Sequence, residues 1–141
     1  MKFAGMGIAV AVFAVLASAF SPPEPSQADK IARGKYLVEG VVLCGDCHTP
    51  HDEKGEAIEG RAFRGAPLTF KPITPVPGFA DKAPNIAGLR GWEDEAAVKF
   101  LMTGIAYNDL PARPPMPQYR LNRDDAEAVV AYLKSLKPSD N

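Results

Sequence analysis

The stretch C-G-D-C-H at residues 44–48 contains the only two cysteines of this 141-residue chain, and a histidine directly follows the second. A disulfide between Cys44 and Cys47 would close a tiny loop and contribute little chain-entropy stabilisation. A thioredoxin-type redox pair is typical of a βαβ context, which the sequence does not show. A zinc site would take Cys44, Cys47, His48 and His51, but structural zinc usually joins two separate segments of a chain. None of these three interpretations accounts for the whole motif.

Helical periodicity occurs in three segments of the chain. Residues 29–43 are predicted to form a helix that Asp29 caps. Its apolar face consists of Ile31, Leu37, Val38 and Val41. Residues 91–105 predict a second helix with an acidic first turn, which the helix dipole favours. Residues 122–137 predict a third, which Asn122 caps and which ends in lysines.

The segments between these helices are long, rich in proline and without periodicity. Residues 51–85 and 106–121 predict loops, and no segment predicts a strand. Long loops in compact domains usually wrap around something or act on something. Because the three helices cover fewer than half of the residues after position 28, they offer too little apolar surface for a stable core by themselves.

Covalent haem attachment explains both the motif and the sparse core. Cys44 and Cys47 would form thioethers with the two haem vinyl groups, and His48 would ligate the iron. The porphyrin would then supply the buried apolar surface that the helices lack. We therefore predict one haem c with its iron as the cofactor of an all-α domain.

The N-terminal residues predict export. Lys2 precedes an uncharged, mainly apolar stretch at residues 3–20, followed by a polar, proline-rich segment, which is typical of a secretory signal. Cleavage would follow Ala19 or Ala28. If the stretch is retained instead, it is barely long enough to anchor the protein in a membrane. We expect a signal peptide or retained anchor at 1–28 and the folded domain at 29–141, outside the cytoplasm.

The charge balance excludes one class of partner. Lysine and arginine total 16 and aspartate and glutamate 17, for a formal net charge of -1. Proteins that bind nucleic acid are usually strongly basic, at least on one face. We therefore expect no nucleic acid partner.

Several segments, taken in order, resemble the single-haem c-type cytochromes of the bacterial class I kind. They are RGKYLV before CGDCHTP, then APNIAG, GWEDEAAVKFLMTG, PPMPQYRL and AVVAYLKSL, and they cover residues 29 to 138. The chain is most similar to the haem domains in cytochrome subunits of membrane-bound bacterial dehydrogenases, which often carry several haem motifs where this chain has one. The resemblance implies a small cytochrome c fold of three or more helices, with long loops wrapped around the haem.

Met116 is the predicted second axial ligand. His51 is only three residues from His48, too few to pass round the porphyrin to its other face. Met102 lies in an apolar helical run, where methionine commonly fills the core. Met116 lies in a loop between two prolines, which restrict the free loop and would help to hold a weak thioether–iron bond. The resemblance also supports Met116, and thioether ligation raises the reduction potential.

Further residues are candidates for contact with the haem. The resemblance implies that the carbonyl of Pro50 accepts the N–H of His48 and that Asn85 lies at the haem edge, where the alternative is a turn-forming role. Trp92 either donates its indole N–H to a propionate or packs in the core. Tyr119 and Arg120 either reach propionates or form a solvent-facing pair. Gly34 and Tyr132 are expected where the first and last helices cross.

Two filled axial positions would leave the iron no site for a substrate, which favours outer-sphere electron transfer. We expect no enzyme but a periplasmic carrier or an electron-transfer subunit, with a dehydrogenase, an oxidase or another cytochrome as redox partner. No acid–base pair or nucleophile accompanies the motif. The alternatives are a peroxidase-like haem enzyme or gas sensor with a labile sixth ligand, and a zinc-stabilised binding module. The proline-rich loop 65–84 either covers the haem edge or docks a partner.

Overall fold

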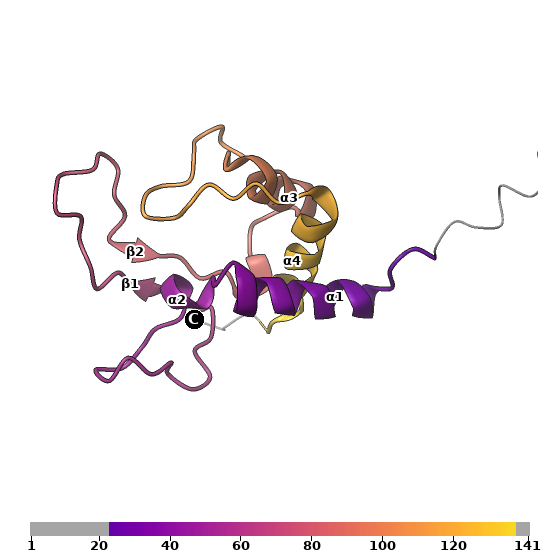
Figure 1. Cartoon of the computed structure of the whole chain (residues 1–141), viewed down its shortest axis with the longest axis horizontal. Helices are drawn as coiled ribbons and strands as arrows, with labels where there is room; N and C mark the ends of the chain where they lie inside the picture. The colour runs from indigo at the N-terminus through magenta and orange to yellow at the C-terminus, as the bar shows by residue number, and fades with distance from the viewer. Residues whose placement is uncertain (1–22, 138–141) are drawn as a thin grey trace, which may run out of the picture.

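The computed structural model describes residues 23–137, and these residues form a mainly helical domain (Figure 1). In chain order the elements are α1 (Gln27–Tyr36), the π-helix η2 (Leu37–Val41), α2 (Gly45–His48), β1 (Ala66–Pro67), β2 (Lys82–Ala83), the 3₁₀-helix η3 (Ala87–Leu89), α3 (Asp94–Thr103) and α4 (Arg123–Ser135). The three predicted helices and the all-α class are confirmed. Of the signal peptide or anchor expected at 1–28, residues 1–22, with the apolar stretch 3–20, lie outside the described residues.

The first helix begins earlier than predicted. Ser26, and not Asp29, is the N-cap of α1, and its hydroxyl accepts a hydrogen bond from the Asp29 backbone N–H at 3.2 Å. The Asp29 carboxylate in turn accepts from the Ser26 backbone N–H at 3.1 Å. This reciprocal pair is a capping box, in which the third helical residue returns the bond of the cap. None of the helices within 23–137 is both long and apolar enough to cross a membrane.

A π-helical turn interrupts the predicted continuation of α1. The Val42 N–H donates to the Leu37 carbonyl at 2.7 Å, five residues back, so η2 holds one residue more than an α-turn. The extra residue rotates the chain that follows. Leu37 and Val38 are buried as predicted, whereas Val41 is 53% exposed and does not belong to the apolar face.

Helices α1 and α4 cross at Gly34, as predicted. A Cβ at Gly34 would lie 1.9 Å from the Ala128 carbonyl oxygen and 2.7 Å from the Tyr132 Cβ. Only glycine permits this approach of the two backbones. In Figure 1, α4 runs behind α1, with α3 above it.

The ends of α3 and α4 follow the local signals in the sequence. Gly104 ends α3 in the left-handed conformation, and its N–H donates to the Phe100 carbonyl at 2.7 Å. The side chain of Asn122 caps α4 by accepting from the Asp125 N–H at 2.9 Å. These caps fix where the second proline-rich segment, residues 106–121, starts and stops.

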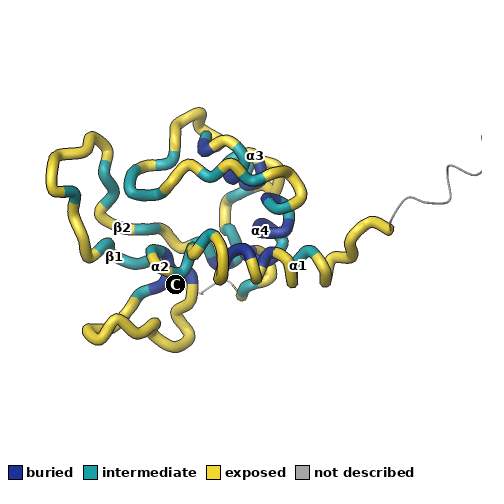
Figure 2. Tube along the Cα trace, in the orientation of Figure 1, coloured by how far each residue is buried: buried dark blue, intermediate teal, exposed yellow. Residues whose placement is uncertain are grey.

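The buried core lies where the helices meet (Figure 2). Its largest fully buried side chains are Val38 and Val129. Phe63 is the one buried apolar side chain contributed by the segment between α2 and β1, and its ring packs edge-on against Tyr132 at 6.3 Å. This contact attaches an otherwise exposed loop to the helical core.

A short antiparallel ladder, which the sequence did not predict, closes the base of the proline-rich loop. Ala66 pairs with Ala83 and Pro67 with Lys82. The Leu68 N–H extends the pairing to the Asp81 carbonyl at 2.9 Å. The two strands lack alternating apolar residues, because neither lies over a core, and this explains why the pattern gave no signal.

Candidate functional site

The CxxCH motif forms a single helical turn of its own. Cys44 is the N-cap of α2, Cys47 lies within the helix and His48 is its last residue. Both cysteines are half-buried, and they form no disulfide with each other. Residues three apart on a helix lie on the same side, so the two sulfur atoms are presented together. Burial raises the pKa of the Cys44 thiol to about 11.

One ring nitrogen of His48 is occupied by a hydrogen bond to the backbone. The side chain is buried, with 6% exposed, and Nδ1 lies 2.7 Å from the carbonyl oxygen of Pro84. A carbonyl oxygen only accepts, so Nδ1 carries the proton and donates it, which leaves the Nε2 lone pair for a ligand. Burial lowers the pKa of His48, against the weaker opposite effect of the Pro84 carbonyl, and favours the neutral imidazole that binds metals.

The carbonyl that accepts the hydrogen bond from His48 is not the one predicted from the sequence. Pro50 was expected in that role, but its carbonyl accepts from the Ile58 N–H at 3.0 Å. Pro50 is only two residues from His48, and its carbonyl bonds within the loop that follows α2. Pro84 is brought back beside the ring by the β1–β2 ladder, 36 residues further along the chain.

Gly65 permits this return of the chain. It has a φ of +82°, and a Cβ there would lie 2.8 Å from the Asn85 nitrogen and 2.9 Å from the Ala83 carbonyl oxygen. Its own N–H donates to the His48 carbonyl at 2.7 Å. Gly65 and Pro84 therefore hold the backbone and the ring of His48 from the two ends of the same loop.

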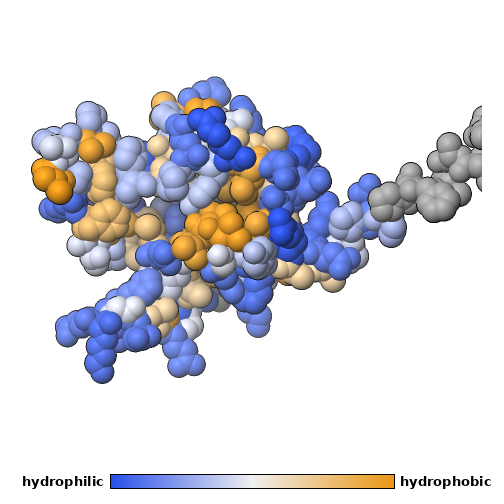
Figure 3. Space-filling model, viewed as in Figure 1, coloured by the Kyte–Doolittle hydropathy of each residue, from blue (hydrophilic) through white to orange (hydrophobic). Residues whose placement is uncertain are grey.

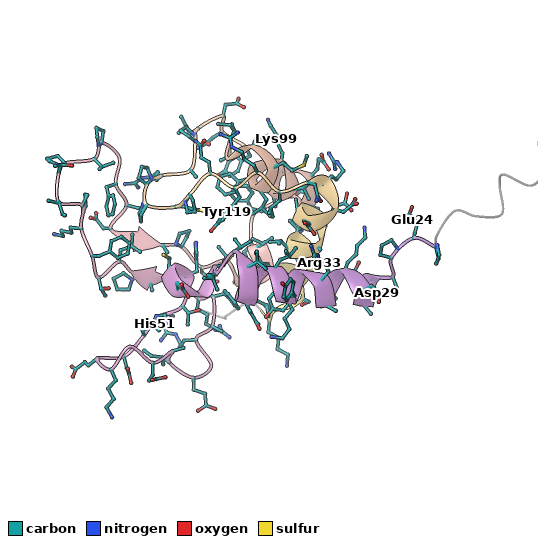
Figure 4. All side chains as sticks on the ribbon, viewed as in Figure 1. Glu24, Asp29, Arg33, His51, Lys99 and Tyr119 are labelled. Carbon is teal, nitrogen blue, oxygen red and sulfur yellow. The ribbon has the colours of Figure 1, made fainter. Side chains whose placement is uncertain are left out.

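Met116 lies in a proline-rich turn and is half-buried. Its N–H donates to the Arg113 carbonyl at 3.0 Å, and the peptide bond between Pro114 and Pro115 is cis. Met102 packs against the buried cluster on α3, as expected of a core methionine. His51 is exposed on the loop after α2 (Figure 4). The structure thus places these three sulfur and nitrogen candidates in three different surroundings.

Tyr119 connects the Met116 segment to the residues before the motif. Its hydroxyl donates to the Val42 carbonyl at 3.2 Å, and the side chain is half-buried (Figure 4). Burial is the main cause that raises the pKa of Tyr119 to about 12, so the hydroxyl remains a donor at neutral pH. The solvent-facing alternative is therefore wrong for Tyr119, whereas Arg120 is exposed.

Asn85 and Trp92 make the contacts expected of their structural alternatives, a turn and ring packing. The Asn85 side-chain oxygen accepts from the Ala87 N–H at 2.9 Å, which is a turn-forming bond. Trp92 packs against the rings of Phe100 and Tyr107, with centroids at 5.4 and 5.2 Å. Contacts of either residue with haem propionates stay predictions.

The chemistry of these donors fits a covalently bound haem. Two adjacent thiols and an imidazole with a free Nε2 lie on one turn, which is the set that thioether attachment and axial ligation require. Figure 3 shows apolar side chains gathered near the middle of the viewed face, where η2 leads into α2. Val41 and Leu43 of this stretch are 53% and 48% exposed. Within 23–137, no three His, Cys, Asp or Glu side chains cluster as a metal site.

Sequence reasoning missed the contribution of residues 78–80 and Arg113. Arg113 Nε donates to the Gly78 carbonyl at 3.0 Å, and a terminal nitrogen donates to the Phe79 carbonyl at 3.3 Å. The Ala80 N–H donates to the Pro114 carbonyl at 2.7 Å. No local pattern indicates these bonds, because they join two aperiodic segments more than 30 residues apart.

Comparisons with a family model and with curated proteins all point to cytochromes c. The model of the Cytochrome c family matches residues 31–137. The chain is 33% identical over 139 residues to the gluconate 2-dehydrogenase cytochrome c subunit of Pantoea cypripedii, covering 92% of this chain and 31% of that protein. It is 30% identical over 128 residues to the cytochrome c subunit of a quinone-dependent alcohol dehydrogenase of Gluconacetobacter polyoxogenes, covering 82% and 26%. The fructose dehydrogenase cytochrome subunit of Gluconobacter japonicus is 31% identical over 115 residues, covering 74% and 21%. The chain thus spans less than a third of each of these relatives.

Proposed function

This chain belongs to the cytochrome c family, and we propose that it transfers electrons through its haem c with His48 and Met116 as axial ligands. The observation that carries the proposal is the arrangement of His48, which is buried and bonded through Nδ1 to the Pro84 carbonyl. That bond fixes the tautomer and the orientation of a metal-binding imidazole. Haem c, attached through Cys44 and Cys47, supplies a one-electron iron couple.

The protein supplies rigid positioning around that couple. The bonds of Pro84 and Gly65 hold the ring and the backbone of His48 in one place. Fixed ligands reduce the rearrangement that accompanies each change of oxidation state, which outer-sphere transfer requires. The Met116 thioether would occupy the opposite axial position, so that no site for a substrate remains.

The relatives support a role inside a redox chain. Those compared above are cytochrome subunits of alcohol, gluconate and fructose dehydrogenases. We propose that this chain likewise exchanges electrons with protein partners, as the electron-accepting subunit of a dehydrogenase or as a carrier to an oxidase or another cytochrome. In either role it is the electron-transfer component and not the catalytic one.

Export remains part of the proposal. We propose that the mature domain keeps Ser26; the capping box of Ser26 and Asp29 supports this, because processing after Ala28 would remove the cap of α1. Of the two cleavage positions predicted from the sequence, the one after Ala19 is compatible with this helix. N-terminal sequencing of the mature chain tests this choice.

Absorption spectroscopy of the matured holoprotein tests the ligation. The ferric wild type is expected to show the weak red band of thioether-ligated haem, and its ferrous form should bind carbon monoxide poorly. Met116→Leu removes the sulfur at similar volume and should lose the band and bind carbon monoxide readily. Met102→Leu is the matched control, since its sulfur packs against the core, and should behave as wild type.

Two outcomes would contradict the proposal. Persistence of the red band in Met116→Leu would show that Met116 is not the ligand. Ready carbon monoxide binding by a wild type without the band would favour the peroxidase-like or gas-sensing alternative.

A further inference from the structure

The loop between β1 and β2 contacts both segments that carry the proposed axial ligands. At its base, Pro84 accepts from His48 Nδ1 at 2.7 Å and Gly65 donates to the His48 carbonyl at 2.7 Å. The ladder of β1 and β2 fixes the distance between these two points. The base of the loop is thereby attached to the histidine side of the site.

The part of the same loop that leads into β2 is attached to the turn that carries Met116. The Arg113 guanidinium donates to two successive carbonyls, those of Gly78 at 3.0 Å and Phe79 at 3.3 Å. The next residue, Ala80, donates its N–H to the Pro114 carbonyl at 2.7 Å. In Figure 1, the loop drawn between β1 and β2 and the segment leading from α3 to α4 approach each other on the same side of the molecule.

Arg113 belongs to the Met116 turn as well as to this junction. Its own carbonyl accepts from the Met116 N–H at 3.0 Å. A planar guanidinium presents its N–H groups in a fixed fork, so bonds to two neighbouring carbonyls define the orientation of the residue that bears it. The position of Arg113 therefore fixes the backbone N–H of Met116, which is bonded to its carbonyl.

We infer that Arg113 is a positioning residue for the Met116 thioether, acting through the β1–β2 loop. The inference rests on the proposed function, because it requires Met116 to be a ligand. The loop then links the two ligands: Gly65 and Pro84 at its base hold His48, and residues 78–80, directly before β2, hold the Met116 turn. Arg113 is exposed, so its effect on ligation does not come from packing in the core.

If Arg113 positions Met116, its loss should change the equilibrium between the attached and detached states of the Met116 thioether. With Met116 as a ligand, its thioether would exchange between bound and detached positions in the ferric protein, and an added ligand would bind only when it is detached. The apparent dissociation constant of an added ligand varies inversely with the detached fraction. Loss of the two guanidinium bonds is expected to increase that fraction about fivefold, since single hydrogen bonds change such equilibria by a few-fold.

The experiment is an imidazole titration of the ferric holoprotein, followed by the loss of the red band. Arg113→Gln should lower the apparent dissociation constant about fivefold. Arg113→Lys should fall between Arg113→Gln and wild type, because a single ammonium cannot reproduce the fork. Arg61→Gln is the matched control: Arg61 is exposed on the loop between α2 and β1, and its variant should titrate as wild type. Far-ultraviolet circular dichroism should show the same helical content in all four proteins.

The outcomes separate the inference from the proposed function. If Met116→Leu abolishes the red band but Arg113→Gln titrates like Arg61→Gln, the inference is wrong and the proposed ligation holds. If Met116→Leu keeps the band, the proposed ligation fails and the inference fails with it. A loss of helical content in Arg113→Gln alone would also overturn it, since a general structural role would then explain the change.

Discussion

Replacing Gly34 by alanine tests whether the crossing of α1 and α4 organises the domain. A Cβ at this position would lie 1.9 Å from the Ala128 carbonyl oxygen, where carbon–oxygen contacts are normally about 3.3 Å. The two helices would therefore have to separate by about 1.4 Å, the difference between these values. The obstructing atom is part of the α4 backbone and cannot rotate aside, as a side chain could.

The expected cost follows from the packing on both sides of the crossing. A gap of about 1 Å forfeits up to half of the dispersion energy between the atoms that face it. Val38, Val129 and Leu133 are buried beside this crossing, and each contributes about 1.5–3 kcal/mol by burial. Alanine regains about 1 kcal/mol over glycine in helix propensity. We therefore expect Gly34→Ala to lower the free energy of unfolding by about 2–4 kcal/mol, consistent with severe overpacking.

Guanidinium chloride unfolding of the holoprotein measures this change. With a denaturant slope of about 2–4 kcal/mol/M, the midpoint should fall by about 1 M. Gly40→Ala is the matched control in the neighbouring π-helix, because a Cβ there would meet only the Tyr36 ring at 3.7 Å. Its midpoint should stay level or rise slightly. Equal midpoints for the two variants would refute the argument that backbone contact at Gly34 fixes the crossing.

Two further predictions concern the base of the loop and the acid stability. Gly65→Ala forces a Cβ against Asn85 and Ala83 at a φ of +82°, and should destabilise the holoprotein by about 1–3 kcal/mol in the same denaturation assay; a wild-type midpoint would contradict the need for glycine there. Glu39 has a lowered pKa, first through its bond from Lys35 and then through that from Tyr132. The stability that this carboxylate contributes is present above its unfolded pKa, near 4.5, and is lost as the pH falls through the lower folded pKa. Glu39→Gln should therefore be less stable than wild type at about pH 7, and the gap should narrow as the pH falls below about 4.5 in thermal melts; a constant gap would contradict this assignment.

The sequence predicted the features that depend on local chemistry. Asn122 as a cap and the crossing at Gly34 follow from rules that involve one residue or one helical period, and the structure confirms them. Asp29 was misassigned as the cap by three residues, because Ser26 and Asp29 share a reciprocal motif in which either polar residue fits the cap pattern. The exposure of Val41 also escaped prediction, since periodicity does not reveal the extra residue of a π-turn.

The features that could not be predicted depend on contacts between residues far apart in the sequence. Pro84 is one of five prolines in the segment 51–85, and nothing local distinguishes the one whose carbonyl meets His48. The pairing of Arg113 with Gly78 and Phe79 likewise depends on where two irregular loops meet. The sequence therefore predicted a set of donor atoms, which stays a prediction, and it missed the backbone carbonyl that orients His48.

The distribution of buried residues supports the expectation that the haem contributes to the stability of this chain. The apolar side chains buried within 23–137 come mainly from η2, α3 and α4, while the β1–β2 loop and the Met116 turn stay half-buried or exposed (Figure 2). Backbone bonds such as those of Gly65 and Ala80 hold these loops, yet fixing the backbone of one residue costs about 1–2 kcal/mol, as much as one hydrogen bond contributes. Each loop has more residues than such bonds, so hydrogen bonding by itself cannot offset the entropy of ordering them. We propose that burial against the porphyrin supplies the missing contribution. The same loops would then hold His48 and Met116 around the iron, so that ordering the loops and positioning the ligands would be one process.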